Sequence, residues 1–192
     1  MSSITKTRTT KETDINLTLN INGTGKSTIN SGVPFLDHML ESFSKHSLID
    51  LDLTCIGDTH IDDHHSVEDI GIVLGQAIAE AIYPIQKVER FGSSVIVMDE
   101  AAVSCDIDLS NRPFLIFELN VDGKVGNFDV ELVEEFFRAI ILNSKITAHI
   151  IMLRGKNKHH IIEASFKALA VAYRRALVTN ERTGIPSTKG IL

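Results

Sequence analysis

The sequence predicts an α+β fold made of two similar halves, each with the element order ββαβα. Two observations indicate this fold. Segments in which apolar and polar residues alternate, as in half-buried β-strands, are interleaved with longer runs of helical period. In addition, a short motif at residue 64 recurs at residue 159, and the same shift of 95 positions carries residues 48–56 onto 143–151. We therefore expect a single duplicated domain over residues 1–192, in which each half is a sheet covered by helices on one face and a pseudo-two-fold axis relates the halves.

The first half, about residues 1–92, begins with a predicted β-hairpin. Apolar side chains at alternate positions of residues 15–21 favour a strand with one buried face, and Asn22-Gly23-Thr24-Gly25 favours a turn into a strand over 26–30. The further elements expected in this half are a helix over 34–45, a strand over 48–56 and a helix over 64–83.

The second half, about residues 93–192, repeats this order. Its expected elements are strands over 94–108 and 114–121, a helix over 128–142, a strand over 146–153 and a helix over 159–178. A shift of 95 places His38 over Val133, with Glu134 and Glu135 one or two positions away. The first helix of each half is therefore expected to offer a ligand.

Composition and charge narrow the classes of function. A net charge of −6, without a basic run or an aromatic platform, argues against nucleic-acid binding. Residues 1–11 are polar, and no segment reaches the roughly 18 apolar residues of a membrane span. Cys55 and Cys105 lie in apolar strand-like segments without the spacing of a zinc or redox motif, so we expect buried, reduced thiols. These features predict a soluble, cytoplasmic protein.

The recurring motif consists of two adjacent histidines and a glutamate three residues after the second, at the start of a predicted helix. Its copies are His64-His65-Ser66-Val67-Glu68 and His159-His160-Ile161-Ile162-Glu163. Helical residues three or four apart share a face, whereas neighbours point about 100° apart, so the histidines of a pair diverge and can serve two ions. Imidazole and carboxylate groups suit divalent Mn, Fe or Zn. Two copies predict a paired-metal site, whereas solvated histidines would explain a single copy equally well.

The other histidines are less specific. His38, at the head of a helix, is a further candidate ligand, with a buried, hydrogen-bonded histidine as the alternative. His46 and His149 are expected to be structural by position alone. The aspartates of residues 58–63 either orient ligating rings through the ring N–H groups or form a polar loop.

Two basic features bear on anion binding. Residues 23–28 resemble the end of a phosphate-binding P-loop, but Asn20 stands where its first glycine would be and a strand is expected to follow, so we interpret the segment as a turn and exclude an NTPase. Arg90, Arg112 and Lys189 lie in expected loops. Two guanidinium forks and one ammonium group would suit a phosphate, with solvated surface charges as the alternative.

Six segments together indicate a family. They are Phe35-Leu36-Asp37-His38-Met39, Asp62-Asp63-His64-His65-Ser66-Val67-Glu68-Asp69, Arg90-Phe91-Gly92, Met98-Asp99-Glu100, Gly155-Lys156-Asn157-Lys158-His159-His160 with Glu163, and Pro186-Ser187-Thr188-Lys189-Gly190. Across nearly the whole chain they closely resemble the imidazoleglycerol-phosphate dehydratase family of histidine biosynthesis. The expected duplicated fold is also similar to that of the family.

The resemblance implies two Mn²⁺ ions, or other divalent metals, per active site, and a homo-oligomer of 24 subunits with active sites between subunits. The implied metal ligands are His38, His64, His65, Glu68, His159, His160 and Glu163. Glu135 stands where the family usually has a histidine, so it either coordinates as a carboxylate or leaves one metal with one imidazole fewer. Asn111 replaces the family's usual glycine before Arg112, which is expected to affect that turn.

The implied reaction removes water from imidazole glycerol phosphate to give imidazole acetol phosphate. The carbon that loses a hydrogen is not adjacent to a carbonyl group, so the reaction needs another group to accept electrons. We expect the two metals to bind the substrate's imidazole as an imidazolate, whose electrons expel the hydroxyl group. Glu12 matches an acidic family residue near the substrate and is expected to transfer a proton, with Asp99 as a second candidate. The residues that match the phosphate grip are Arg90, Arg112, Ser187, Thr188 and Lys189, with Lys167 and His46 as peripheral contacts.

Two other classes of protein fit the repeated motif. A metal-storage protein would hold ions without turnover, although the basic loop residues argue against it. A dimetal hydrolase would use a metal-bound hydroxide on a phosphate ester, although it would require a close metal pair with carboxylate bridges. With Mn²⁺ and imidazole glycerol phosphate, the dehydratase forms a ketone, the hydrolase releases phosphate, and the storage protein does neither.

Overall fold

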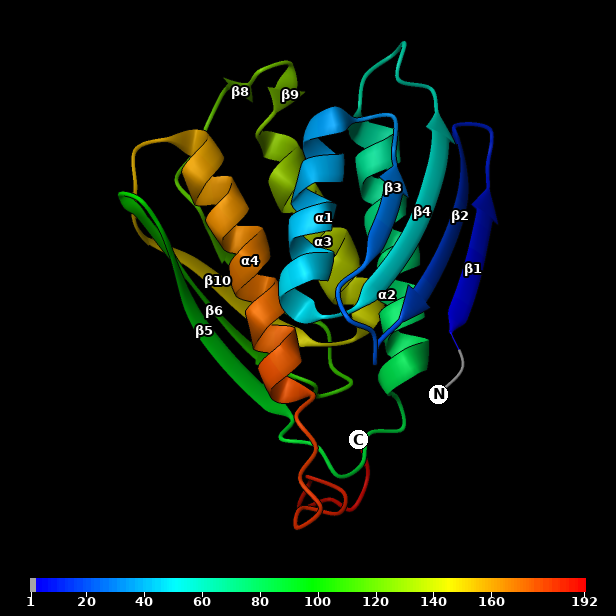
Figure 1. Ribbon diagram of the computed structural model, residues 1–192, viewed down its shortest axis with the longest axis vertical. Coiled ribbons are helices and arrows are strands. Elements are labelled where there is room, and N and C mark those ends of the chain that lie inside the picture. The colour runs from blue at the N-terminus through cyan, green and yellow to red at the C-terminus, as the bar shows by residue number, and fades with distance from the viewer. Residues whose placement is uncertain (1–2) are drawn as a thin grey trace.

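The computed structural model describes residues 3–192 as two four-stranded sheets with four helices packed between them (Figure 1). The first sheet has the order β1 (Ile4–Thr9), β2 (Thr13–Asn20), β4 (Asp50–Gly57) and β3 (Ser27–Asn30). The second has the order β5 (Phe91–Met98), β6 (Ala101–Asp108), β10 (Thr147–Arg154) and β7 (Phe114–Glu118). The helices are α1 (Pro34–Ser47), α2 (His64–Ile82), α3 (Glu131–Ser144) and α4 (Lys158–Ala176). A short ribbon of β8 (Lys124–Val125) and β9 (Phe128–Asp129) precedes α3.

The α+β class and the internal duplication are confirmed, but each four-stranded sheet contains one strand more than predicted, and the second half also contains the short β8–β9 ribbon. In each sheet, three strands are joined by antiparallel pairs and the fourth strand at the edge pairs in parallel with its neighbour. The first extra strand is β1, which lies in the polar segment before residue 11 and pairs with β2. The second arises because the predicted strand 94–108 is two strands, β5 and β6, with a turn at Asp99, whose φ is 48°.

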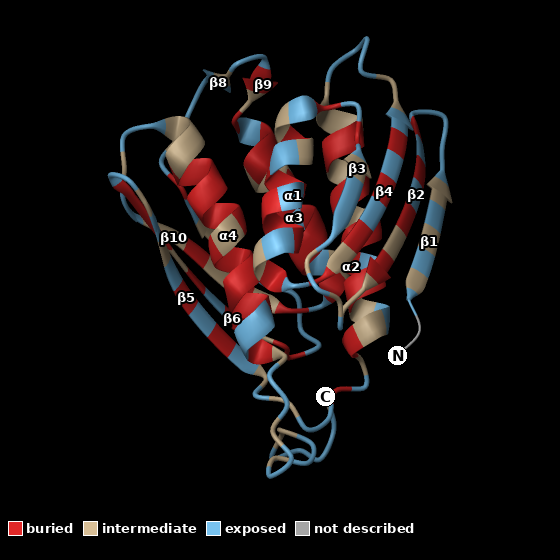
Figure 2. Ribbon diagram, in the orientation of Figure 1, coloured by how far each residue is buried: buried red, intermediate tan, exposed pale blue. Residues whose placement is uncertain are grey.

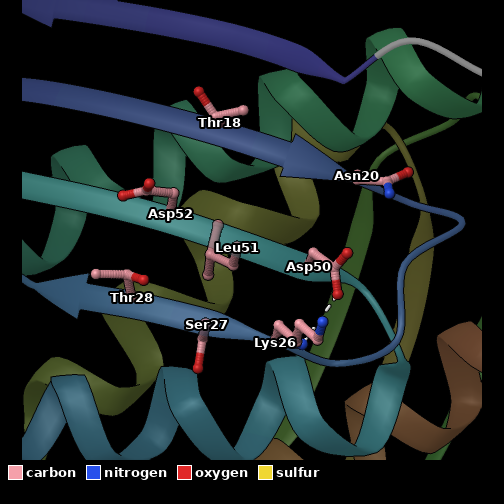
Figure 3. Close-up of a pocket in the computed structure, with 8 residues that line it drawn as sticks. All are labelled: Thr18, Asn20, Lys26, Ser27, Thr28, Asp50, Leu51 and Asp52. Carbon is pink, nitrogen blue, oxygen red and sulfur yellow. Dashed lines mark hydrogen bonds between the residues drawn. The ribbon is translucent and has the colours of Figure 1, made fainter.

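The predicted hairpin between residues 15–21 and 26–30 is wrong, because β4 lies between β2 and β3. Figure 3 shows the connecting segment near the start of β4. There the Asp50 carboxylate accepts hydrogen bonds from the backbone N–H groups of Thr24 (2.8 Å) and Lys26 (2.9 Å). This carboxylate directs the chain across the end of β4, so that β3 pairs on the far side of β4. As expected for residues 23–28, a strand and not a helix follows them.

Matching the two halves requires two different shifts. Helices α1 and α3 begin at residues 34 and 131, a shift of 97, and the same shift relates Leu48 to Lys145, which end these helices in the left-handed conformation with φ of 64° and 57°. The two histidine motifs lie 95 positions apart, and not 97, because the connection that leads to the last helix is shorter in the second half. This connection runs over residues 58–63 in the first half and over residues 155–157 in the second. Under the shift of 97, His38 corresponds to Glu135, and not to Val133 as the uniform shift of 95 predicted.

The core lies between the sheets and along the paired helices α1 with α4 and α2 with α3 (Figure 2). Helices α2 and α3 approach closely at Gly71 and Gly75. A Cβ added at Gly71 would lie 2.8 Å from the Cβ of Ala139, and one at Gly75 would lie 2.7 Å from the carbonyl oxygen of Ile140. These close contacts determine how α2 is positioned along the axis of α3. They therefore also determine where the first turns of the two helices lie relative to each other. None of the helices within residues 3–192 is both long and apolar enough to cross a bilayer.

Candidate active site

Three candidate ligands meet between α1 and α4. The Nε2 atom of His159 lies 3.1 Å from Oε2 of Glu163, one helical turn away, and Nε2 of His38 lies 3.4 Å from the same oxygen. One ligand atom from each of these residues lies within 4.8 Å of the others. Two imidazole nitrogens and a carboxylate oxygen at this separation fit a divalent cation.

Lys167 controls the charge of this group of His38, His159 and Glu163, which we call the triad. Its ammonium group lies 2.7 Å from Oε1 of Glu163, leaving Oε2 directed at the two histidines. Burial alone would raise the pKa of Glu163, but Lys167, His38 and His159 together hold that pKa below its ordinary value. The carboxylate therefore stays ionised and available as a ligand.

The corresponding residues of the other helix pair are farther apart. Nε2 of His64 lies 3.7 Å from Oε2 of Glu68 on α2, and Glu135 is a half-buried residue of the first turns of α3. In the part of the chain that the structure describes, the His38 triad is the one group of three His, Cys, Asp or Glu side chains close enough to share an ion. The structure thus brings together His38, His159 and Glu163, but not His64, Glu68 and Glu135.

The second histidine of each motif points away from its triad and contacts two carboxylates. For His65, Nδ1 lies 3.0 and 3.1 Å from the oxygens of Asp58, and Nε2 lies 3.8 Å from Oε1 of Glu12. Asp58 is thus the one aspartate of residues 58–63 whose carboxylate contacts the ring of His65, an arrangement compatible with the predicted orienting role. Asp62 has a different role, since it accepts a hydrogen bond from the backbone N–H of His64 at 2.8 Å.

His160 repeats this arrangement with different partners. Its Nδ1 lies 2.8 Å from Oε2 of Glu100, and its Nε2 lies 3.8 Å from Oδ2 of Asp99. Hydrogen bonds to Asp58 and Glu100 respectively raise the pKa of His65 and of His160. In return, backbone N–H groups and His160 lower the pKa of Glu100 to about 2.

The two proton-transfer candidates occupy equivalent turns. Glu12 lies between β1 and β2, and Asp99 lies between β5 and β6, the outermost antiparallel pair of each sheet. Each is 3.8 Å from the Nε2 atom of the second histidine in its own half. Both residues were predicted from the sequence, whereas the roles of Asp58 as the specific partner of His65 and of Glu100 as the partner of His160 were not. The Met98-Asp99-Glu100 segment was the available signal for Glu100.

The phosphate candidates gather in a separate pocket of about 310 Å³. Its lining residues include Arg90, Arg112, Ser187, Thr188 and Lys189. Arg90 donates to both oxygens of Asp108, at 2.7 and 3.0 Å, and to the carbonyl oxygen of Pro186 at 2.7 Å, so its charge is largely compensated. Arg112 and Lys189 are exposed and supply the accessible positive charge.

Asn111 and the segment after α4 shape this end of the molecule. Asn111 has a φ of 55°, a left-handed conformation that asparagine adopts more readily than most residues. The turn before Arg112 therefore tolerates asparagine without backbone rearrangement. The last five residues of the pocket wall come from the segment after α4, which lies beyond the C-terminal end of that helix (Figure 1).

His46 and Lys167 do not line this pocket within the single chain described from residue 3 to residue 192. Lys167 binds Glu163 of the triad. Burial and the nearby charges of Lys167 and Arg174 lower the pKa of His46. The carbonyl oxygen of His46 accepts a hydrogen bond at 3.0 Å from Arg174 of α4, the helix that carries Glu163 and Lys167. The expected peripheral phosphate contacts are therefore separated from the main pocket in one chain.

Comparison with known proteins decides the family. The family model described as imidazoleglycerol-phosphate dehydratase matches residues 31–173, which include both histidine motifs. The chain belongs to the imidazoleglycerol-phosphate dehydratase family. It is 71% identical to the imidazoleglycerol-phosphate dehydratase of Sulfurimonas denitrificans over 189 residues, covering 98% of this chain and 100% of the relative, and 68% identical to that of Aliarcobacter butzleri, covering 96% and 97%.

Solved structures of imidazoleglycerol-phosphate dehydratases also match the fold. That of the Staphylococcus aureus enzyme superposes with a TM-score of 0.85 at 43% identity, covering 93% of this chain and 100% of the other. That of the Pyrococcus furiosus enzyme superposes with a TM-score of 0.84 at 39% identity, covering 97% and 100%. The protein is therefore a hydro-lyase of histidine biosynthesis, as the sequence predicted.

Proposed function

We propose that each active site of this dehydratase holds two divalent metals, with Mn²⁺ as the first choice. The observation that carries the proposal is the convergence of His38, His159 and Glu163 on one point. By the correspondence between the halves, Glu135, His64 and Glu68 would form the second set of ligands. Glu135 would then bind through its carboxylate, so the second centre would have two carboxylates and the first would have one.

The remaining ligands support assembly from several subunits. His65 and His160 diverge from the triads of their own chain, and their Nε2 atoms have no hydrogen bond within 3.5 Å among the described residues. Each would complete a metal centre together with a triad from a neighbouring subunit. Large exposed apolar side chains on the second sheet, such as Val95, Val97 and Phe114, support burial against further copies. We propose a homo-oligomer of 24 subunits with active sites between them.

The same assembly would complete the phosphate site. Arg112, Lys189, Ser187 and Thr188 would bind the phosphate of the substrate, and Asp108 would hold Arg90 in position beside them. His46 and Lys167 of a neighbouring subunit would supply the outer contacts. Binding the phosphate at one end fixes the glycerol chain relative to the metals, which lowers the entropic cost of reaching the reactive geometry.

The reaction requires two proton movements around the bound substrate. The metals would act as Lewis acids that stabilise the imidazolate form of the substrate ring. The hydroxyl group on the carbon next to the ring leaves with a proton as water, and Glu12 takes the hydrogen of the next carbon, giving an enol that becomes the ketone. Asp99 occupies the equivalent turn and is the alternative proton carrier.

Metal analysis tests this proposal. Protein loaded with Mn²⁺ should contain two ions per chain, and His38→Ala should lose at least one of them. His149→Ala is the matched control, since His149 lies on β10 between Asp106 and Ile116 of the adjacent strands. One ion per chain, or equal loss in both variants, would contradict the two-metal site.

The free, buried thiols of Cys55 and Cys105 support the reducing cytoplasm as the compartment.

A further inference from the structure

We propose that Asp58 and Glu100 are positioning residues that select the tautomer of His65 and His160, and that Glu100 also holds the start of α4 in place. This inference rests on the proposed role of the two histidines as metal ligands. It assigns a function to two carboxylates that bind neither metal nor substrate in the proposed site.

The tautomer follows from the donor and acceptor capacity of the groups. An ionised carboxylate can only accept, so the ring nitrogen at 2.8 Å from Glu100, or at 3.0 Å from Asp58, must carry the hydrogen. A neutral imidazole has one N–H group, so the lone pair is then on Nε2. The Nε2 atom of each ring is 3.8 Å from its nearest carboxylate, too far for a hydrogen bond, and it remains available to a metal.

The two halves reach this result by different routes. In the first half, residues 58–63 form a connection long enough to carry its own carboxylate, Asp58, back to His65. In the second half, residues 155–157 are the whole connection, and they contain no acidic residue. The carboxylate comes instead from Glu100, in the turn between β5 and β6.

Glu100 has additional contacts that Asp58 lacks. Its Oε1 accepts hydrogen bonds from the backbone N–H groups of Lys156 (3.0 Å) and Asn157 (2.7 Å). The Asn157 side chain in turn accepts from the backbone N–H of His159 at 3.0 Å and so caps α4. One carboxylate therefore joins the β5–β6 turn, the short connection and the His160 ring. Its loss should disturb the start of α4 as well as the ring.

Two substitutions at Glu100 separate these functions. In Glu100→Gln, the amide oxygen can still accept from Lys156 and Asn157, but the amide NH₂ group faces Nδ1 of His160, which must become the acceptor. The hydrogen then moves to Nε2 and blocks the metal. Glu100→Ala removes both functions, and Asp58→Asn makes the tautomer change at His65 alone.

The experiment measures Mn²⁺ affinity by competition with a chelator, together with backbone hydrogen exchange of the assembled, full-length protein. Glu100→Gln and Asp58→Asn should each weaken Mn²⁺ binding by about 10-fold to 100-fold, the range found for outer partners of ligating histidines. Exchange over residues 155–161 should match that of the wild type in Glu100→Gln and rise in Glu100→Ala. Glu118→Gln, at an exposed position of β7, is the control and should bind Mn²⁺ normally.

The outcomes distinguish this inference from the metal site on which it rests. Normal Mn²⁺ affinity in Glu100→Gln and Asp58→Asn, with weakened affinity in His160→Ala and His65→Ala, would overturn the positioning role and leave the metal site intact. Normal affinity in His160→Ala and His65→Ala would instead overturn the ligand assignment. Faster exchange over 155–161 in Glu100→Gln, equal to that in Glu100→Ala, would overturn the tautomer assignment, since the weaker affinity would then reflect lost structure.

Discussion

His38 and Glu135 occupy equivalent positions in the two halves, each the fifth residue of the first long helix of its half. An imidazole on α1 thus corresponds to a carboxylate on α3. Because carboxylates favour harder cations than imidazoles do, the two proposed metal centres should differ in preference.

Glu135→His should make the second centre resemble the first, and it should raise the affinity for Zn²⁺ relative to Mn²⁺. Glu135→Ala should instead lower the bound Mn²⁺ toward one ion per chain. The neighbouring Glu134 pairs with Arg138 at 2.6 Å, so Glu134→Ala is a matched control that should retain two ions. Metal competition and elemental analysis measure both effects, and equal metal contents in all variants would show that Glu135 is not a ligand.

Removing Glu12 should stop proton transfer without removing the metals. Glu12→Gln keeps the size of the side chain, and we expect turnover to fall by about 10²-fold to 10⁴-fold, as for a general acid or base. Asp99→Asn should have a smaller effect if Glu12 is the main proton carrier. Measuring kcat beside metal content tests the assignment, and the opposite order of the two variants would give the role to Asp99.

The exposed cations of the pocket should act on substrate binding. Hydrogen bonds to charged groups contribute about 1.5–3 kcal/mol, so Arg112→Ala or Lys189→Ala should raise KM by about 10-fold to 100-fold. Metal content should not change, because the pocket shares no residue with the triad. Lys87→Ala is the control, since Lys87 pairs with Glu181 at 2.7 Å. A fall in kcat at unchanged KM would argue against a phosphate grip.

Stability and metal affinity should depend on pH in opposite directions. Contacts with Asp58 and Glu100 raise the pKa of His65 and His160 above 6.5, so these rings stabilise the metal-free protein at low pH, and this contribution is lost as the pH rises through the raised values. Mn²⁺ requires the deprotonated rings, so its affinity should increase over the same range. Thermal unfolding in chelator and Mn²⁺ titrations between pH 5.5 and 8.5 test this. Parallel trends would contradict it.

Close packing of α2 on α3 should limit substitution at Gly71. In Gly71→Ala the new Cβ would meet the Ala139 Cβ at 2.8 Å and the Phe136 carbonyl oxygen at 3.0 Å, so the helices must separate. We expect a loss of about 1–3 kcal/mol of stability and weaker metal binding at Glu68 and Glu135. Adding Ala139→Gly should restore part of the unfolding temperature. An unchanged unfolding temperature in Gly71→Ala would show that the contact does not constrain the helices.

The helices and the ligand motifs were accessible from the sequence because both depend on local spacing. Pro34, the apolar periodicity of residues 64–82 and the repeated His-His pairs all act within a few helical turns, and the observed helix bounds lie within a few residues of the predicted ones. The strand order was not accessible. The pairing of β3 with β4 depends on Asp50, a residue some 25 positions away from the turn that it holds.

By itself, therefore, the sequence determined the α+β class, the duplication and the candidate metal-ligand motifs. The tertiary structure decided which of those residues meet. It joined His38 to His159 and Glu163 across more than 120 positions, matched Glu135 with His38 and brought Glu100 to His160. These contacts depend on how sheets and helices pack, and a change of two or three residues in a connecting loop shifts them without altering the local pattern.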